Sequence, residues 1–222
     1  VMSNEFLSRR VLELEPSATL AMNAKVKKLT AEGKKVISFS VGEPDFKTPK
    51  HICDAAKKAI DDGIHGYTAV AGVPELRKAI ADSLTRDTGV PFKPEQTVAS
   101  PGGKYSIYLT LLALINPGDE VIIPAPYWVS YPEMVRLVGG VPAIVDTREE
   151  DLFALSPAAL DAAITPKTKL IILTSPSNPT GQVVPAPVIE EIGAIMEKRG
   201  IWCLSDEIYN HLIFGTAVHK SV

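Results

Sequence analysis

The residues best suited to chemistry follow a predicted buried stretch near the C-terminal end of the sequence. Residues 201–205 are mostly bulky and apolar, follow Gly200, and are succeeded by Asp206, Glu207 and Tyr209. Such a run is typical of a strand that is buried on both faces. Carboxylates after such a strand lie where open α/β sheets bind their ligands, beyond the carboxyl ends of the strands. For this segment alone, capping of a following helix is the simpler explanation of the two acids.

A glycine-rich turn at residues 100–104 is suited to binding an anion. A predicted strand turns there through Gly102 and Gly103 into a predicted helix that begins near Lys104. Glycine lets the backbone approach a ligand closely, and the free N–H groups at a helix start attract phosphate. Such turns are also common for steric reasons alone. The turn matches neither the dinucleotide fingerprint nor the P-loop.

Two further loops place an aromatic ring and an amide after predicted strands. Trp128 follows Ala125-Pro-Tyr, although a lone tryptophan belongs to a core more often than to a ligand platform. Asn178 stands between Pro176 and Pro179, and such a stiff backbone holds an amide ready to orient a ligand. Turn chemistry alone explains Asn178, but it explains poorly the combination with Asp206.

The order of the predicted elements indicates an α/β fold with a mostly parallel sheet flanked by helices. Strands are predicted at residues 97–100, 120–124, 141–145, 169–174 and 201–205. Helices are predicted between them, at residues 104–115, 131–138, 158–164 and 188–199. Upstream, the sequence predicts an irregular arm over residues 1–16, helices at 17–32, 49–62 and from Pro74 onward, and a strand at 36–41. Residues 63–72 form a predicted loop that contains Tyr67.

Composition and charge favour a protein that acts on small molecules. The 222 residues are 45% hydrophobic and 22% charged, enough for one large domain with a substantial core, or for a domain and part of another. The net charge of −3 comes without a long basic block, so neither nucleic acid nor a membrane is an expected partner. We expect a cytoplasmic protein. Cys53, Cys203 and the four histidines match no metal-ligand spacing, so no metal site is predicted.

Six sequence motifs, taken together, resemble those of a known family. They are Gly42-Glu-Pro-Asp45, Tyr67, Gly103-Lys104, Pro126-Tyr-Trp128-Val-Ser-Tyr131-Pro-Glu, Ser177-Asn-Pro-Thr-Gly181 and Ser205-Asp-Glu-Ile-Tyr209. Their order and spacing are similar to those of the class I/II pyridoxal-phosphate aminotransferases, and most of all to the prokaryotic-type aspartate aminotransferases. The resemblance runs over essentially the whole chain.

The resemblance implies an architecture and partners. The fold would be that of the fold-type I pyridoxal-phosphate-dependent transferases. Residues 1–48 would form an N-terminal arm and part of a small domain, and residues 49–222 a large cofactor-binding domain that is incomplete at its C-terminus. The protein would be a homodimer with its active site at the subunit interface. It would transaminate between an amino acid, with aspartate the leading candidate, and 2-oxoglutarate.

The resemblance also implies roles for residues that bind pyridoxal 5'-phosphate. Asp206 would pair with the pyridine nitrogen, which favours the protonated ring and makes the cofactor a better electron sink. Tyr209 and Asn178 would bond the ring's 3'-oxygen, and Trp128 would stack on the ring face. We expect Asp206, Asn178 and Trp128 to share one cavity.

Other motif residues would bind the phosphate and the substrate. Gly103 and Lys104 would offer backbone N–H groups to the phosphate, and the Lys104 side chain is as readily explained as a solvated or salt-bridged group beside the site. Tyr67 would reach the phosphate of the neighbouring subunit. Gly42 would contribute backbone to the substrate carboxylate region, so Gly42, Trp128 and Asn178 are the predicted substrate-binding residues.

One part of the family pattern is absent from the sequence. The lysine that forms the Schiff base lies, in relatives, well beyond the segment that ends at Tyr209. Here only Lys220 follows Asp206, and its setting, His219-Lys220-Ser221-Val222, does not match that motif. No catalytic residue can therefore be assigned, and because the imine requires an amine we expect this polypeptide alone to be unable to transaminate.

Two alternative functions remain open. One is another pyridoxal-phosphate enzyme of the same fold, such as an aromatic or alanine aminotransferase or a carbon–sulfur lyase, since a fold does not fix a reaction. The other is a non-catalytic domain that binds pyridoxal phosphate as an effector. A panel of amino donors discriminates the first alternative, and a DNA-binding segment would favour the second.

Overall fold

The structure is a computed structural model that describes residues 7–12, 14, 18–38, 42 and 44–222. The chain divides into two compact units, one of residues 16–99 and one of residues 1–15 together with 100–222. The predicted domain boundary between residues 48 and 49 stays a prediction. Within the described ranges, no helix has both the length and the apolar character needed to cross a membrane.

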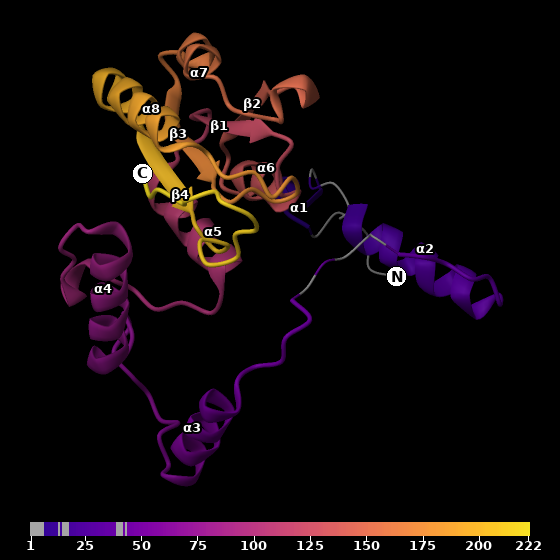
Figure 1. The fold of residues 1–222 in the computed structure, drawn as a ribbon, viewed down its shortest axis with the longest axis vertical. Helices are drawn as coiled ribbons and strands as arrows, with labels where there is room; N and C mark the ends of the chain where they lie inside the picture. The colour runs from indigo at the N-terminus through magenta and orange to yellow at the C-terminus, as the bar shows by residue number, and fades with distance from the viewer. Residues whose placement is uncertain (1–6, 13, 15–17, 39–41, 43) are drawn as a thin grey trace. The chain divides into compact units, whose positions relative to one another are not determined.

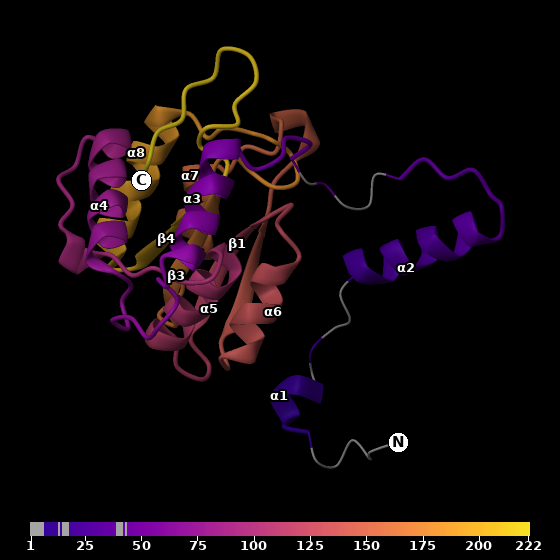
Figure 2. The ribbon, with the colours of Figure 1, turned by 90° about the horizontal axis from the view of Figure 1, so that it is seen from below.

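The larger unit is built on a four-stranded parallel sheet with the strand order β2-β1-β3-β4 (Figure 1). Figure 2 labels β1, β3 and β4 in a second view. Its strands are β1 (Glu120–Ala125), β2 (Val141–Asp146), β3 (Thr168–Thr174) and β4 (Trp202–Asp206). In the register, Ile122 lies opposite both Ala143 and Ile171. The parallel sheet confirms the predicted fold class, and all four strands lie where the sequence predicts them.

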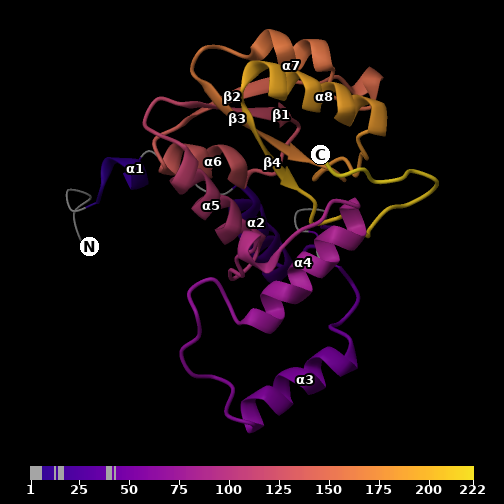
Figure 3. The same cartoon turned by 90° about the vertical axis from the view of Figure 1, so that its left-hand side faces the viewer.

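Helices cover both faces of this sheet (Figure 3). On one face lie α5 (Gly103–Leu114) and α6 (Ser130–Leu137), and on the other α7 (Pro157–Ala163) and α8 (Ala186–Arg199). Successive strand residues alternate between the two layers, as the pleat requires. Val121 and Ile123 pack in the α5 and α6 layer, whereas Ile122 packs in the α7 and α8 layer. Two separate apolar cores therefore hold the sheet rigidly between them.

Local sequence signals set the helix ends. Helix α8 begins at a proline-rich turn, and it ends at Gly200, whose φ of 68° is left-handed. Glycine occupies this conformation without the steric cost that a Cβ would bring. A short helix, α1 (Arg9–Leu12), lies within the arm that the sequence predicts to be irregular, and it contacts α6. A 3₁₀ turn, η3 (Glu149–Asp151), follows β2.

The smaller unit is helical. It contains α2 (Ala18–Ala31), α3 (Lys50–Asp61), α4 (Pro74–Thr88) and the 3₁₀ turn η2 (Pro94–Gln96). The Arg77 guanidinium on α4 donates to the Pro94 carbonyl at 2.6 Å and to the Thr97 carbonyl at 3.1 Å. These bonds tie α4 to η2 and to the segment that leaves the unit.

Two strand predictions are wrong for the residues described. Residues 97–100 and 36–38 are irregular, while residues 39–41 of the second predicted strand lie outside the described part of the chain. The Ala99 N–H donates to the Ala71 carbonyl at 2.9 Å, and the Thr97 N–H donates to the Pro94 carbonyl at 3.1 Å. These backbone groups bond to loop and turn carbonyls instead of a neighbouring strand, so no ladder forms.

Candidate functional site

The candidate site lies at the carboxyl ends of two neighbouring strands, the inner strand β3 and the outer strand β4. Asp206 is the last residue of β4 and Thr174 the last residue of β3, and the two are paired in the register. Parallel strands bring their carboxyl ends to one edge, which is where open α/β sheets bind ligands. The sequence-based placement of Asp206 at a strand end is therefore correct.

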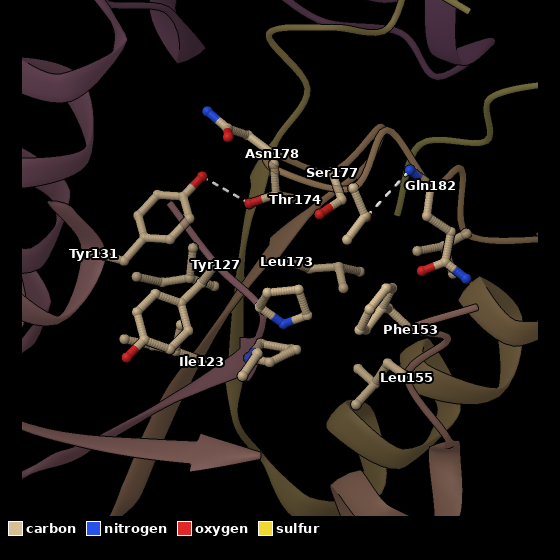
Figure 4. Close-up of a pocket in the computed structure, with 16 residues that line it drawn as sticks. Ile123, Tyr127, Tyr131, Phe153, Leu155, Leu173, Thr174, Ser177, Asn178 and Gln182 are labelled. Atoms are coloured by element: carbon tan, nitrogen blue, oxygen red, sulfur yellow. Dashed lines mark hydrogen bonds between the residues drawn. The ribbon is translucent and has the colours of Figure 1, made fainter. Parts of the chain in front are cut away.

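A buried tyrosine connects these two strand ends. The Tyr131 hydroxyl lies 2.7 Å from the Asp206 Oδ2 and 2.7 Å from the Thr174 Oγ1. Tyr131 is 2% exposed and comes from α6, so three separate elements meet at one phenol. Figure 4 shows its contact with Thr174. The other Asp206 oxygen, Oδ1, accepts the Ile208 N–H at 3.2 Å. Each carboxylate oxygen of Asp206 thus has its own donor.

Burial raises the pKa of Tyr131 far above its ordinary value. The hydrogen bond from Thr174 partly offsets this rise, and the bond to Asp206 and its negative charge increase it further. The nearby Tyr209 adds a smaller contribution in the same direction, which places Tyr209 in the electrostatic surroundings of the phenol. Tyr131 therefore remains a protonated hydrogen-bond donor at any pH at which proteins work.

Trp128 and Lys104 extend this cluster on the α6 side. The Trp128 and Tyr131 rings meet edge to face, with centroids 5.3 Å apart and an interplanar angle of 87°. The Lys104 Nζ lies 4.8 Å from the Trp128 ring centroid, within the range of a cation–π contact. The Lys104 side chain is exposed, as the interpretation of a solvated group expects, and its ammonium is also a neighbour of the predicted stacking ring.

A cavity of about 280 Å³ adjoins Asp206 and the start of α5. Its lining includes Gly103 and Ser106 from α5, and Asp206 and Glu207 from the end of β4. No side chain among the described residues caps the first turn of α5, and Gly102 precedes it with a φ of 87°. A helix start with uncapped N–H groups favours an anion. The cavity therefore has an anion-binding wall and a carboxylate wall.

Asn178 lines a second, smaller cavity of about 40 Å³, with Tyr127, Tyr131 and Thr174 (Figure 4). Figure 4 shows the Asn178 amide at the same edge of this cavity as the Tyr131 hydroxyl. Sequence reasoning expects Asp206, Asn178 and Trp128 to share one cavity, whereas Asp206 and Asn178 line two. The Tyr131 side chain joins them, because it lines the Asn178 cavity and bonds to Asp206.

The neighbouring acid, Glu207, has different partners from Asp206. It accepts hydrogen bonds from the Ser205 and Ser221 hydroxyls, each at 2.6 Å, and its Oε2 lies 3.1 Å from the His219 Nε2. Burial opposes ionisation of this carboxyl, but the hydrogen bonds outweigh burial and lower the pKa of Glu207. Glu207 thereby holds the C-terminal segment against the end of β4.

The other residues singled out from the sequence are Tyr67, Gly42 and Lys220. Tyr67 and Gly42 belong to the unit of residues 16–99, where both are exposed. Lys220 is exposed in the irregular segment after β4. The roles predicted for Tyr67 and Gly42, like those of Asp206, Trp128, Tyr209, Asn178, Gly103 and Lys104, stay predictions.

Tyr131 and Thr174 have no role in the sequence-based prediction. One signal could have found Tyr131: it follows Trp128 by three positions at the start of a helix, and residues three apart on a helix are neighbours. Its N–H donates to the Trp128 carbonyl at 3.0 Å. Thr174 closes a predicted strand, so its place at the ligand-binding edge was implied by the pattern.

Comparison with known proteins identifies the family. The sequence matches the profile described as Aminotransferase class I and II over residues 34–222. The chain belongs to this family. The predicted resemblance is confirmed by relatives, among them the aspartate aminotransferase of Geobacillus stearothermophilus, 46% identical over 216 residues that cover 97% of this chain and 55% of that protein. The aspartate/prephenate aminotransferase of Thermus thermophilus is 45% identical, covering 94% of this chain and 54% of that protein.

Solved structures of family members have the same fold. The aspartate aminotransferase from Thermus thermophilus with maleate superposes with a TM-score of 0.92 at 44% identity, covering 97% of this chain and 56% of that one. The alanine aminotransferase from Pyrococcus furiosus superposes with a TM-score of 0.92 at 34% identity, covering 97% of this chain and 55% of that one. The predicted transferase fold is therefore confirmed, and this chain spans about half the length of these family members.

Proposed function

We propose that the protein is a pyridoxal-phosphate-dependent aminotransferase that exchanges an amino group between aspartate and 2-oxoglutarate. The observation that carries this proposal is the cavity with Asp206 on one wall and the uncapped start of α5 on another. A small molecule that carries both a ring cation and a phosphate matches these walls, with the cation at the Asp206 carboxylate and the phosphate at the start of α5. The names of the aspartate aminotransferase relatives support the choice of reaction.

The chemistry of the residues in the larger unit supports pyridoxal phosphate as the cofactor. The backbone of Gly103 and Lys104 at the start of α5 would hold the phosphate, and the Asp206 carboxylate would hold the ring nitrogen. Asn178 and Tyr209 would bond the ring oxygen, with Trp128 against the ring face. When bound, the cofactor supplies the electron sink that lets the substrate lose its α-proton.

Within this proposal the chain's residues bind and orient. The Asp206 carboxylate would favour a proton on the ring nitrogen, because a nearby negative charge favours the protonated form. Gly42, Trp128 and Asn178 would bind the substrate. Tyr67 would act in a neighbouring copy, which makes the working form a homodimer with a shared site. We place this homodimer in the cytoplasm.

An amino-donor panel tests the reaction. The intact gene product, supplied with pyridoxal phosphate, should convert aspartate and 2-oxoglutarate faster than alanine, aromatic or sulfur-containing donors. Asp206→Asn should lower kcat strongly, because a neutral amide no longer stabilises the protonated ring, whereas Asp161→Asn on α7 should leave kcat unchanged. Turnover that survives in Asp206→Asn would contradict the assignment of Asp206.

A second acceptor belongs in the same panel. Several relatives are named aspartate/prephenate aminotransferase, including those of Thermus thermophilus and Nitrosomonas europaea. We therefore include prephenate as an amino acceptor with aspartate as the donor. A higher kcat/KM for prephenate than for 2-oxoglutarate would replace the proposed acceptor and leave the cofactor site as proposed.

A further inference from the structure

The Tyr131 phenol occupies the centre of the polar network behind the cavity. It is almost fully buried, and its oxygen lies 2.7 Å from two oxygens on different strands. Its ring is fixed by the edge-to-face contact with Trp128. A buried side chain held on several sides has little freedom to turn away. The phenol is therefore a rigid donor aimed at Asp206.

Proton counting gives this network a direction. A phenol carries one proton, and an ionised carboxylate can only accept. Tyr131 therefore donates to the Asp206 Oδ2, and the Thr174 hydroxyl donates to the Tyr131 oxygen. With the Ile208 N–H on the other oxygen, Asp206 receives one donor at each oxygen, from α6 on one side and from its own following turn on the other. Two donors on opposite oxygens fix the plane of the carboxylate.

We propose that Tyr131 is a positioning residue, supported by Thr174, that holds the Asp206 carboxylate in the orientation needed to grip the ring nitrogen of the cofactor. This inference rests on the proposed function. Charge-assisted hydrogen bonds are about twice as strong as neutral ones, so the bond from the phenol restrains the carboxylate more than a neutral contact would. Tyr131 itself need not touch substrate or cofactor.

The main test measures cofactor binding rather than turnover. Titration of the cofactor-free intact gene product with pyridoxal phosphate, followed by intrinsic fluorescence, gives a Kd for each variant. Tyr131→Phe removes the donor and keeps the ring, so we expect its Kd to rise roughly tenfold. Tyr108→Phe is the matched control, because Tyr108 packs beside the same core and lines neither cavity. Its Kd should equal that of the parent protein.

Absorbance of the bound cofactor against pH provides a second readout. Loss of the fixed carboxylate should shift the pH at which the bound cofactor titrates in Tyr131→Phe, with no shift in Tyr108→Phe. In steady-state kinetics, kcat should fall while KM for aspartate changes little, because Asp206 faces the cofactor rather than the amino acid. A merely structural role would leave the spectral titration unchanged.

Variants at Thr174 keep the inference falsifiable if Tyr131→Phe fails to fold. Thr174→Val removes the hydroxyl that donates to the phenol and should raise the Kd by about two- to threefold. Thr174→Ser restores the hydroxyl and should restore the Kd.

The outcomes separate the inference from the proposed function. If the parent protein binds pyridoxal phosphate but Tyr131→Phe matches Tyr108→Phe in Kd and spectral titration, the positioning role is wrong and the proposed function stands. If the parent protein binds no pyridoxal phosphate, both are overturned.

Discussion

The two units of the chain differ in how far their apolar side chains are buried. In the unit that contains the sheet, side chains such as Ile122, Ile171 and Leu111 are fully buried. In the unit of residues 16–99, the described part buries only Ala81 and Thr97, while Ile60 on α3 is 66% exposed. Both units have regular helices, so the periodic spacing of apolar residues accompanies helix formation in each. A core forms only where a second layer covers the apolar face.

The largest expected difference between the units lies in the cost of removing one apolar side chain. Ile122→Ala should lower the free energy of unfolding by about 2–5 kcal/mol, because it leaves a cavity between β1 and the α7 and α8 layer. Ile60→Ala should change it by no more than about 0.5 kcal/mol. Denaturant unfolding of both variants measures the contrast. Equal losses would mean that α3 is covered in solution.

A polar contact is the corresponding anchor in the smaller unit. Arg77→Met keeps most of the side chain's bulk but removes the bonds to the Pro94 and Thr97 carbonyls, at a cost of about 1.5–3 kcal/mol. We expect faster amide hydrogen exchange around η2, with no change in the sheet. Arg86→Met on the exposed side of α4 is the control. Unchanged exchange around η2 in Arg77→Met would show that apolar contacts hold this unit as well.

The contacts of Glu207 with Ser205, Ser221 and His219 make the stability of the larger unit sensitive to acid. Because the pKa of Glu207 is lower in the folded state, its stabilising contribution is complete above the unfolded pKa of about 4.3 and disappears as the pH falls through the folded value. In Glu207→Gln, the melting temperature should therefore fall less than in the parent protein when the pH is lowered from neutral to below about 4.3. Glu197→Gln, on the exposed side of α8, should keep the parent profile.

The smallest expected effect belongs to an exposed ion pair between α7 and α8. The Arg199 Nε and Nη2 lie 2.7 and 2.9 Å from the two Asp161 oxygens, and the guanidinium lowers the pKa of Asp161. Solvent screens such pairs. Arg199→Gln should shift the melting temperature less than Ile122→Ala, and added salt should abolish the shift. A salt-independent shift would indicate a packing role for the side chain.

Sequence patterns predict the sheet unit well because its pattern and its burial agree. Residues 201–205 and 169–174 each contain a continuous apolar run of four residues, and they form the outer strand β4 and the inner strand β3 within one residue of the expected bounds. Residues 97–100 are also predicted as a strand, but only Val98 and Ala99 among them are apolar, and a strand also needs a neighbour to bond with, which is specified elsewhere in the chain. The helical predictions succeed in both units because helix bonds are local.

The site could be predicted by position but not by its internal contacts. Motif likeness and strand ends point to Asp206, Asn178 and Trp128, and the structure brings their elements to one edge of the sheet. The contact of Tyr131 with Asp206 spans 75 positions, and no local rule pairs two residues at that separation. No local rule predicts the division into an Asp206 cavity and an Asn178 cavity either, because that division depends on the position of the Tyr131 ring.

The strand order gives the Tyr131 contacts a mechanical consequence. Thr174 terminates β3, which has neighbours on both sides, whereas Asp206 terminates β4, which pairs only with β3 among the described strands. Peripheral strands fray more readily than central ones. The Tyr131 phenol therefore links the end of β4, the strand end that frays most readily, to the end of the inner strand β3. This link keeps the Asp206 carboxylate in position during small local fluctuations.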